Sequence, residues 1–151
     1  MTIEQAKQEL MKLQEQMSAY NHAMGLISYD GETTAPKGTA ANRAHALGIL
    51  SEITYKISTG KETVELLEYL DAHQQDLSDR EKRMVYLLIK DIRFMQKIPM
   101  EEYVEYQKLT VKSQDVWYNA KLNNDFAAFE PYLEKMFDFQ KRFAQYAAPD
   151  M

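Results

Sequence analysis

The sequence predicts an all-α protein of about six helices in a bundle-like array, on three observations. Hydrophobic residues are 45% of the 151 residues and charged residues 27%, so the chain can form a packed core. Only 5 Gly and 4 Pro interrupt it, too few for the turns of an all-β sandwich or barrel. Long stretches repeat apolar residues every three or four positions, as helices with one buried face do. We find no linker, so residues 1–151 are expected to form a single helical domain.

The first helix is expected from Ile3 to about Asp30. The apolar or aromatic residues that define it are spaced by three and four: Ile3, Ala6, Leu10, Leu13, Met17, Tyr20, Met24 and Ile27. A coiled coil has a similar period, but Ala6 and Tyr20 would make a poor zipper seam, so a bundle helix is favoured. Gly31 can take a left-handed conformation, which predicts the end of the helix near this residue.

Two further helices are expected before residue 73. One begins near Thr39, ends at about residue 60, and has four apolar residues on one face: Ala46, Leu50, Ile53 and Ile57. The other has an apolar face of Val64, Leu67 and Leu70. Its carboxylates follow helical spacing and are interpreted as a solvated face: Glu62, Glu65, Glu68 and Asp71.

A capping box predicts the start of the fourth helix. The Ser78 hydroxyl would accept a hydrogen bond from a free backbone N–H, and Glu81 would reach back to the cap. The run 84–89 is apolar nearly all round, so we expect this helix to be the most enclosed. A basic stripe at helical spacing is interpreted as a solvated, salt-bridged face, although alone it would suit an acidic partner; it comprises Arg83, Lys90, Arg93 and Lys97.

The fifth helix, expected from Met100 to Leu122, has a stripe that combines aromatic rings with hydroxyl groups. Its members are Tyr103, Tyr106, Thr110, Ser113, Trp117 and Ala120. Aromatic surfaces with hydrogen-bonding tips commonly line clefts and interfaces. Two interpretations stay open: the wall of a cleft, or a core face whose hydroxyls bond to neighbouring helices. A sixth helix is expected to start near Pro131, after a turn capped by Asn124 or Asp125.

Composition and charge exclude several classes of protein. Without Cys the chain can form no disulfide, thiol nucleophile or thiolate metal site. The formal charge of −5 argues against a dedicated nucleic-acid binder. No segment approaches the roughly 18 consecutive apolar residues of a membrane span. The N-terminus has no apolar signal-peptide region, so a soluble, cytoplasmic protein is the expectation.

No catalytic or metal-binding residue can be assigned from local motifs. The histidines, His22, His45 and His73, are far apart in sequence and are interpreted as surface or interface residues. A metal site that the fold assembles from all three stays possible. The sequence has no His-Glu-x-x-His, no phosphate-binding glycine loop and no Gly-x-Ser-x-Gly.

The segment 27–43 joins the first two helices and concentrates unusual residues. Asp30 could accept backbone N–H bonds in the turn or pair with Arg43, and either role would fix the corner. A catalytic pair of Asp30 and Glu32 is the alternative, although no partner on the substrate side is visible.

This segment resembles the N-terminal region of the thermostable carboxypeptidase (carboxypeptidase Taq) family of zinc metallocarboxypeptidases. The first matching block is Ile27, Tyr29, Asp30, Thr33, Pro36, Gly38, Arg43 and Ala44. A second block follows in the family's order: Ile98, Pro99, Trp117, Ala120, Asn124, Asp125, Phe126, Phe129, Pro131, Leu133, Glu134 and Lys135. Three positions depart from the family pattern, with Tyr29 for Trp, Ala35 for Met and Lys121 for Arg.

The resemblance implies an N-terminal helical part of a larger, mostly helical metallopeptidase. In that family a zinc-binding His-Glu-x-x-His helix, a further Glu ligand and substrate-binding arginines lie in a longer chain, and none can be placed here. We therefore expect residues 1–151 to lack the catalytic zinc-binding portion and to be inactive alone. Zinc or another divalent metal is implied only for a full-length relative. A catalytically dead helical interaction or dimerisation module is the alternative.

By the same resemblance the chain would form one wall or lid of a substrate cleft. Tyr103, Tyr106 and Trp117 are the candidate wall residues. The matched motif positions are expected to be structural: Asp30, Pro36, Gly38, Arg43, Phe126, Phe129 and Pro131. The expected partners are a peptide substrate or the missing catalytic portion, together with self-association, and neither nucleic acid nor membrane.

Overall fold

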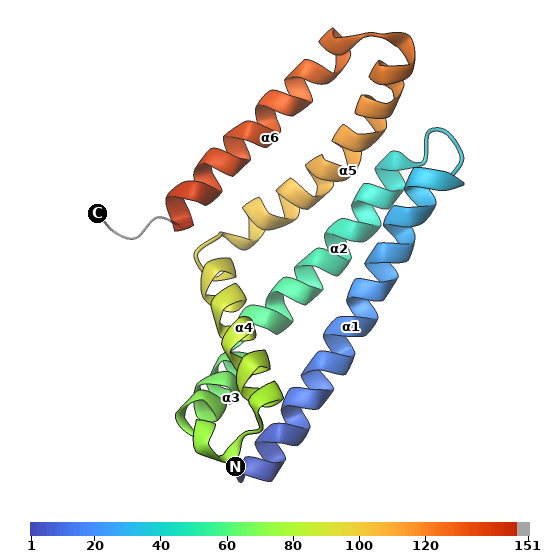
Figure 1. Cartoon of the computed structure of the whole chain (residues 1–151). Coiled ribbons are helices and arrows are strands. Elements are labelled where there is room, and N and C mark those ends of the chain that lie inside the picture. The colour runs from blue at the N-terminus through green and yellow to red at the C-terminus, as the bar shows by residue number, and fades with distance from the viewer. Residues whose placement is uncertain (148–151) are drawn as a thin grey trace. The chain divides into compact units, whose positions relative to one another are not determined.

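The chain folds into six α-helices and one short 3₁₀ helix (Figure 1) in a computed structural model that describes residues 1–147. They are α1 (Ile3–Thr33), α2 (Ala40–Thr59), α3 (Lys61–Ala72), η1 (Gln74–Asp76), α4 (Asp79–Met95), α5 (Met100–Asn123) and α6 (Phe126–Ala147). Residues 1–147 contain no strand, so the predicted all-α class with about six helices is confirmed. No helix among them is long and apolar enough to cross a membrane. Residues 148–151 lie outside the described part.

The helices group into two compact units. Unit 1 contains residues 1–22 and 53–97, and unit 2 contains residues 23–52 together with the chain from Ile98 onward. Because α1 and α2 each contribute to both units, neither unit is a continuous stretch of sequence. The single domain over residues 1–151 stays a prediction.

Unit 1 has a core of aliphatic side chains from the start of α1, from α3 and from α4. Its buried members are Ala6, Leu10, Leu66, Leu67, Leu70, Leu77, Val85 and Ile92. The apolar spacing of α3 predicted Leu67 and Leu70 in this core, and both are buried. Residues three and four apart share one helix face, so each helix directs a single stripe inward.

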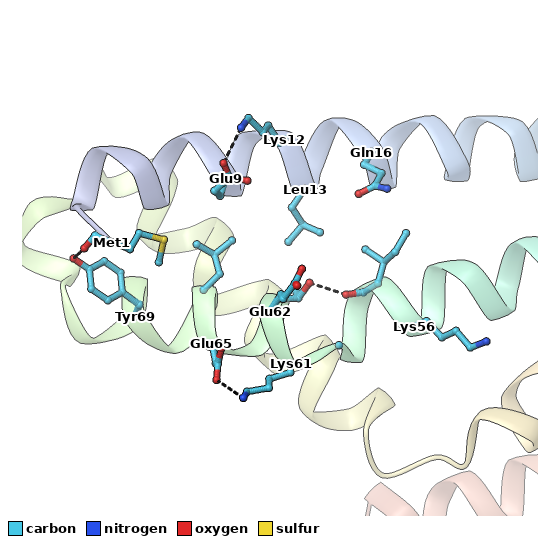
Figure 2. Close-up of a pocket in the computed structure, with 14 residues that line it drawn as sticks. Met1, Glu9, Lys12, Leu13, Gln16, Lys56, Lys61, Glu62, Glu65 and Tyr69 are labelled. Atoms are coloured by element: carbon cyan, nitrogen blue, oxygen red, sulfur yellow. Dashed lines mark hydrogen bonds and ion pairs between the residues drawn. The ribbon is translucent and has the colours of Figure 1, made fainter.

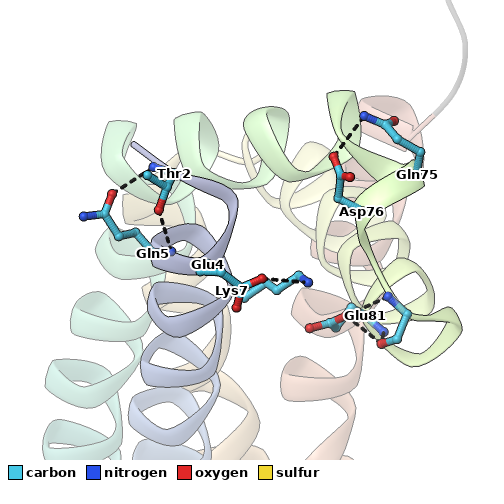
Figure 3. Close-up of polar contacts among 8 residues, drawn as sticks. Thr2, Glu4, Gln5, Lys7, Gln75, Asp76 and Glu81 are labelled. Carbon is cyan, nitrogen blue, oxygen red and sulfur yellow. Dashed lines mark hydrogen bonds and ion pairs between the residues drawn. The ribbon is translucent and has the colours of Figure 1, made fainter.

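Hydrogen bonds between side chain and backbone cap the first turns of two helices in unit 1 (Figure 3). The capping box of α4 forms as predicted: the Ser78 hydroxyl accepts from the Glu81 backbone N–H at 3.4 Å, and the Glu81 carboxylate accepts from the Ser78 N–H at 2.7 Å. A similar reciprocal pair joins Thr2 and Gln5 at the start of α1, with distances of 3.2 and 2.8 Å. The Thr-x-x-Gln spacing is the sequence signature of such a box, which our sequence prediction missed.

The prediction that the fourth helix is the most enclosed is wrong. Within α4 only Val85 and Ile92 are buried, whereas the side chains of Tyr86 and Leu87 are 55% and 40% exposed. A run of consecutive apolar residues covers all sides of a helix, but neighbouring helices cover only one side of α4. The shorter α3 buries more of its residues.

Unit 2 contains the antiparallel pair of α5 and α6, which lie side by side in Figure 1. Its core consists of Ile98, Phe139 and Phe143, with four partly buried residues packed against them: Tyr103, Tyr106, Leu109 and Tyr146. Asn124 takes the left-handed conformation (φ 53°) that ends α5. The Asp125 carboxylate then accepts the Ala128 N–H at 3.2 Å, so both residues predicted to cap this turn do so.

The sixth helix begins five residues earlier than predicted, at Phe126 rather than near Pro131. Proline has no N–H, and the intrahelical bond to the carbonyl of Ala127 is therefore missing. Both residues are exposed, so water can take the place of that donor. A proline close to a helix start is tolerated under these conditions, and Pro131 does not mark the start itself.

The first helix is longer than predicted, because Gly31 does not end it. The helix continues to Thr33, and Gly38 is the glycine with a positive φ, 83°. The absence of a side chain at Gly31 serves a different purpose: a Cβ there would lie 2.6 Å from Nε of Arg43. Gly31 thus gives room for the arginine of the next helix.

Candidate functional site

Two of the three candidate cleft-wall residues are partly buried and pack against the core of unit 2. The ring of Tyr106 lies between two rings of α6, 5.5 Å from Phe139 and 5.2 Å from Phe143 between centroids. The Tyr106 hydroxyl accepts a hydrogen bond from Gln140 at 2.6 Å. Tyr103 packs against the same cluster, and burial raises the pKa of its hydroxyl. These two rings therefore stabilise the contact between α5 and α6.

Trp117, the third candidate, has a different environment. Its side chain is 44% exposed, and the ammonium of Lys121 lies 5.1 Å from the ring centroid. Because only this ring of the three has a large free surface, it is the one best placed to contact another molecule. A role for any of the three in a cleft wall stays a prediction.

The hydroxyl groups of the α5 stripe bond in different ways, and that of Tyr106 accepts from Gln140 of the neighbouring helix α6 at 2.6 Å. Thr110 donates to the carbonyl of Tyr106, one turn earlier in α5, at 2.9 Å. The Ser113 hydroxyl is buried and has no hydrogen-bond partner among the described residues. The interhelical hydrogen bond expected of a core face therefore forms at Tyr106, whereas Thr110 bonds within α5.

A charged cluster that no sequence pattern predicted joins the start of α5 to the end of α6. The Glu102 carboxylate accepts from Nε of Arg142 at 3.0 Å and from the Tyr146 hydroxyl at 3.0 Å. The guanidinium of Arg142 also lies 4.2 Å from the centroid of Phe139. The hydrogen bond to Glu102 raises the pKa of Tyr146. No local motif could reveal this cluster, because its members are 40 and 44 residues apart.

The corner between α1 and α2 is held by hydroxyl groups. The Asp30 carboxylate accepts from the Thr34 hydroxyl at 2.8 Å, and the backbone carbonyl of Asp30 accepts from the N–H groups of residues 34 and 35. Arg43 donates to the Thr39 hydroxyl at 2.6 Å and lies against Gly31. Asp30 accepts backbone N–H bonds in the turn, as expected, but through its backbone carbonyl. Its carboxylate bonds to Thr34, and Arg43 bonds to Thr39 rather than to Asp30. The corner instead uses Thr34 and Thr39.

The two carboxylates of this corner do not form a catalytic pair. Glu32 accepts from the Gln114 amide of α5 at 2.8 Å, while Asp30 bonds to Thr34. Residues two apart on a helix point in different directions, so their side chains diverge. Both are exposed, as general acid–base groups with tuned pKa values usually are not.

The other motif positions lie at turns and helix starts. Pro36 and Gly38 are exposed in the turn before α2. Phe126 is exposed, Phe129 is half-buried and Pro131 is exposed, all within the first two turns of α6. These positions are compatible with a structural role, which stays a prediction.

The three histidines are not assembled into a metal site. His22 and His45 are exposed. His73 is half-buried, with Nδ1 2.7 Å from the carbonyl of Tyr69 and its ring stacked on the tyrosine at 4.2 Å. Among residues 1–147 no group of three or more His, Asp or Glu side chains is placed to hold a metal ion.

Unit 1 has an open groove of about 980 Å³ between α1, the end of α2 and α3 (Figure 2). Four of its charged side chains form two ion pairs: Lys12 with Glu9 at 2.7 Å and Lys61 with Glu65 at 3.6 Å. At one end the Tyr69 hydroxyl donates to the carbonyl of Met1. The groove combines paired surface charges with aliphatic walls, and it contains no arrangement of nucleophile, base and oxyanion donor.

Comparison with known proteins identifies the class to which this scaffold belongs. The sequence model of the family described as "Carboxypeptidase Taq (M32) metallopeptidase" matches residues 9–151. Carboxypeptidase 1 of Bacillus subtilis is 37% identical over 146 residues, which are 97% of this chain and 29% of the relative. Thermostable carboxypeptidase 1 of Pyrococcus furiosus is 32% identical over 128 residues, or 85% of this chain and 26% of the relative.

Solved structures agree with the sequence matches. The BsuCP crystal structure superposes with a TM-score of 0.93 at 35% identity, covering 97% of this chain and 30% of that one. The Pyrococcus furiosus carboxypeptidase gives a TM-score of 0.74 at 30% identity, covering 99% and 30%. The chain belongs to the carboxypeptidase Taq (M32) metallopeptidase family. It spans less than a third of the length of these relatives.

The side chains of this chain do not fit the catalytic metal that a metallopeptidase implies. A catalytic zinc site commonly takes three protein ligands from His, Asp, Glu or Cys and keeps one position open. The sequence has no Cys, and the described residues bring no three of the other donors together. A metal site in full-length relatives would therefore need at least some ligands from outside the described residues.

Proposed function

We propose that this chain is the N-terminal helical portion of a zinc metallocarboxypeptidase that removes C-terminal residues from peptides. Family membership over residues 9–151, combined with coverage of only 29% of the Bacillus subtilis relative, is the observation that carries the proposal. In this role the helices form one wall or lid of the substrate cleft, and the groups that perform hydrolysis belong to the remaining portion.

The chain alone is inactive in this proposal. Hydrolysis by a metallopeptidase needs a water whose pKa the metal lowers to about 7 and a base that takes its proton. Neither a ligand set nor a suitably placed base is found among the described residues. The chemistry therefore requires the remaining portion, whereas this chain contributes shape and peptide contacts.

Within the wall, Trp117 is the proposed contact with peptide. Its half-exposed ring offers an apolar face and an indole N–H donor to a peptide backbone. Tyr103 and Tyr106 act indirectly, since their contacts with α6 fix the position of the helix that carries Trp117.

The second candidate is a catalytically dead module that binds a partner or dimerises. Several large apolar side chains with at least 55% exposure favour it: Leu26, Tyr29, Tyr86, Tyr118, Leu122, Phe126 and Phe137. Large exposed apolar side chains can mark interaction sites. Both candidates give such side chains a partner, but only the first makes that partner the catalytic portion. Self-association and a cytoplasmic location stay predictions.

Complementation tests the proposal. This chain is co-expressed with Bacillus subtilis Carboxypeptidase 1 truncated to remove the segment that matches it, and release of C-terminal residues from a peptide is measured. The controls are each polypeptide alone. We expect activity only when both are present, with the two co-purifying. If the two polypeptides fail to associate, or if activity does not depend on this chain, the proposal is wrong.

A further inference from the structure

Helix α4 presents an exposed face that mixes cations with large apolar side chains. Its members recur at spacings of three and four and are all exposed; this α4 outer face comprises Arg83, Tyr86, Leu87, Lys90, Arg93, Phe94 and Lys97. The three apolar side chains are 55%, 40% and 41% exposed in chain order. On the opposite side of the helix, Val85 and Ile92 are buried in unit 1, so packing fixes which face points outward.

None of the four cations has a carboxylate partner among residues 1–147. Within α4, Lys82 forms an ion pair with Asp79 at 3.6 Å, and Lys82 is not part of this face. Arg83 instead lies over the Tyr86 ring, 5.3 Å from its centroid. The basic stripe of these four cations is therefore solvated, as predicted, but the prediction that it forms salt bridges is wrong. The carboxylates of Glu81 and Asp91, which are near in sequence, do not pair with it.

The chemistry of this face specifies its partner. Apolar side chains gain free energy when they are removed from water, and unpaired cations are best placed opposite carboxylates. A matching surface has carboxylates interspersed with apolar side chains. The chain as a whole is acidic, with 23 Asp and Glu against 18 Lys and Arg, so three unpaired cations on α4 and a fourth in the turn after it are a local exception.

Two other occupants fit less well. A two-fold dimer through this face would place the same four cations opposite each other, because a two-fold interface brings identical patches together. A nucleic acid would be repelled by the remainder of a chain with a net charge of −5. The remaining portion of a carboxypeptidase is a different surface, so symmetry does not require it to place cations opposite this face. The intact relative has this fold over 30% of its chain, with a TM-score of 0.93, and more than twice that length lies outside the match.

We infer that the α4 outer face docks against the remaining portion of a metallocarboxypeptidase of this family, through a surface that combines carboxylates with apolar side chains. The inference rests on the proposed function. It adds which surface of this chain makes the contact and what kind of surface complements it. It also predicts that binding weakens as salt is added, because contacts between exposed charges weaken as ionic strength rises.

Charge reversal tests the inference in the complementation system. The variant is K90E/K97E, which replaces one helical and one turn lysine of the face. The matched control is K37E/K112E, which also replaces one turn and one helical lysine, both exposed and in unit 2. Each variant changes the net charge by the same amount, so nonspecific effects of charge are equal.

Binding of the purified chain to the truncated carboxypeptidase is measured by titration at low and high salt. We expect K90E/K97E to bind at least about tenfold more weakly at low salt, and the control to stay within about twofold of the wild type. The melting temperatures of the isolated variants should match that of the wild type, because the replaced side chains are exposed. A neutral variant, K90Q/K97Q, should give an intermediate loss.

The outcomes separate the inference from the function on which it rests. If the wild-type chain does not bind the truncated carboxypeptidase, the proposed function fails and the inference fails with it. If the wild type binds and K90E/K97E binds equally well, only the inference is overturned. Self-association of the isolated chain that K90E/K97E abolishes would assign the face to a second copy and would also overturn it.

Discussion

Leu70 tests the packing of unit 1 more sharply than any other residue. Its side chain is 0% exposed in the cluster that includes Leu10, Leu67 and Val85. The substitution Leu70→Ala removes three carbon atoms, and at about 0.8 kcal/mol for each the loss of transfer free energy is about 2.4 kcal/mol. A residual cavity of about 50 Å³ at about 24 cal/mol per Å³ adds about 1.2 kcal/mol. The free energy of unfolding should therefore fall by about 3 to 4 kcal/mol.

Leu122→Ala is the matched control, because it is the same substitution at a side chain that is 66% exposed. It should change the free energy of unfolding by no more than about 0.5 kcal/mol. Both variants are unfolded in urea and followed by circular dichroism, which reports all helices. Fluorescence of Trp117, the one Trp of the chain, reports unit 2 separately. A loss below about 1 kcal/mol for Leu70→Ala, or an equal loss for Leu122→Ala, would refute the assigned core.

Three further predictions concern a cap, a turn and the candidate wall. Hydrogen bonds from the Ser78 hydroxyl and backbone N–H lower the pKa of Glu81 below 4.5, so the carboxylate stabilises the fold at neutral pH and loses this effect as pH falls through its folded-state pKa. The difference in free energy of unfolding between wild type and Glu81→Gln, measured in urea, should therefore shrink below pH 4.5. A difference that stays constant with pH would contradict the capping box. Gly38→Ala should lower the free energy of unfolding by about 1 kcal/mol, because φ is 83° there; an unchanged urea midpoint would contradict the assigned turn. Trp117→Ala should reduce the peptidase activity of the complemented enzyme severalfold. The melting temperature of the isolated chain should stay nearly unchanged, because the ring is 44% exposed. Unchanged activity would show that Trp117 is not part of the cleft wall.

The sequence predicted the helices well, because their signals are local. The spacing of apolar residues in α1 and α3 follows from the geometry of 3.6 residues per turn, and the box of Ser78 and Glu81 lies within four residues. The ends of helices were less certain. Glycine and proline are compatible with several environments, so Gly31 in a close approach to Arg43 and Pro131 inside α6 both look like breaks in the sequence.

Burial and the contacts between distant residues could not be predicted. The run 84–89 shows that α4 is apolar but not how many of its sides have neighbours. The bonds of Glu102 to Arg142 and Tyr146 depend on the pairing of α5 with α6, which no local pattern specifies. The family resemblance depended on the order of motif residues along the chain and not on the contacts that these residues make. It therefore holds although the contact expected between Asp30 and Arg43 does not form.

The most direct test of the account is a peptidase assay of the purified chain alone, with and without added zinc. The account predicts that no C-terminal residue is released in either condition, because the described residues offer no set of metal ligands. Zinc should also leave the melting temperature unchanged, as expected when a ligand has no site in the folded state. Zinc-dependent release of C-terminal residues by this chain, free of contaminating proteases, would contradict it.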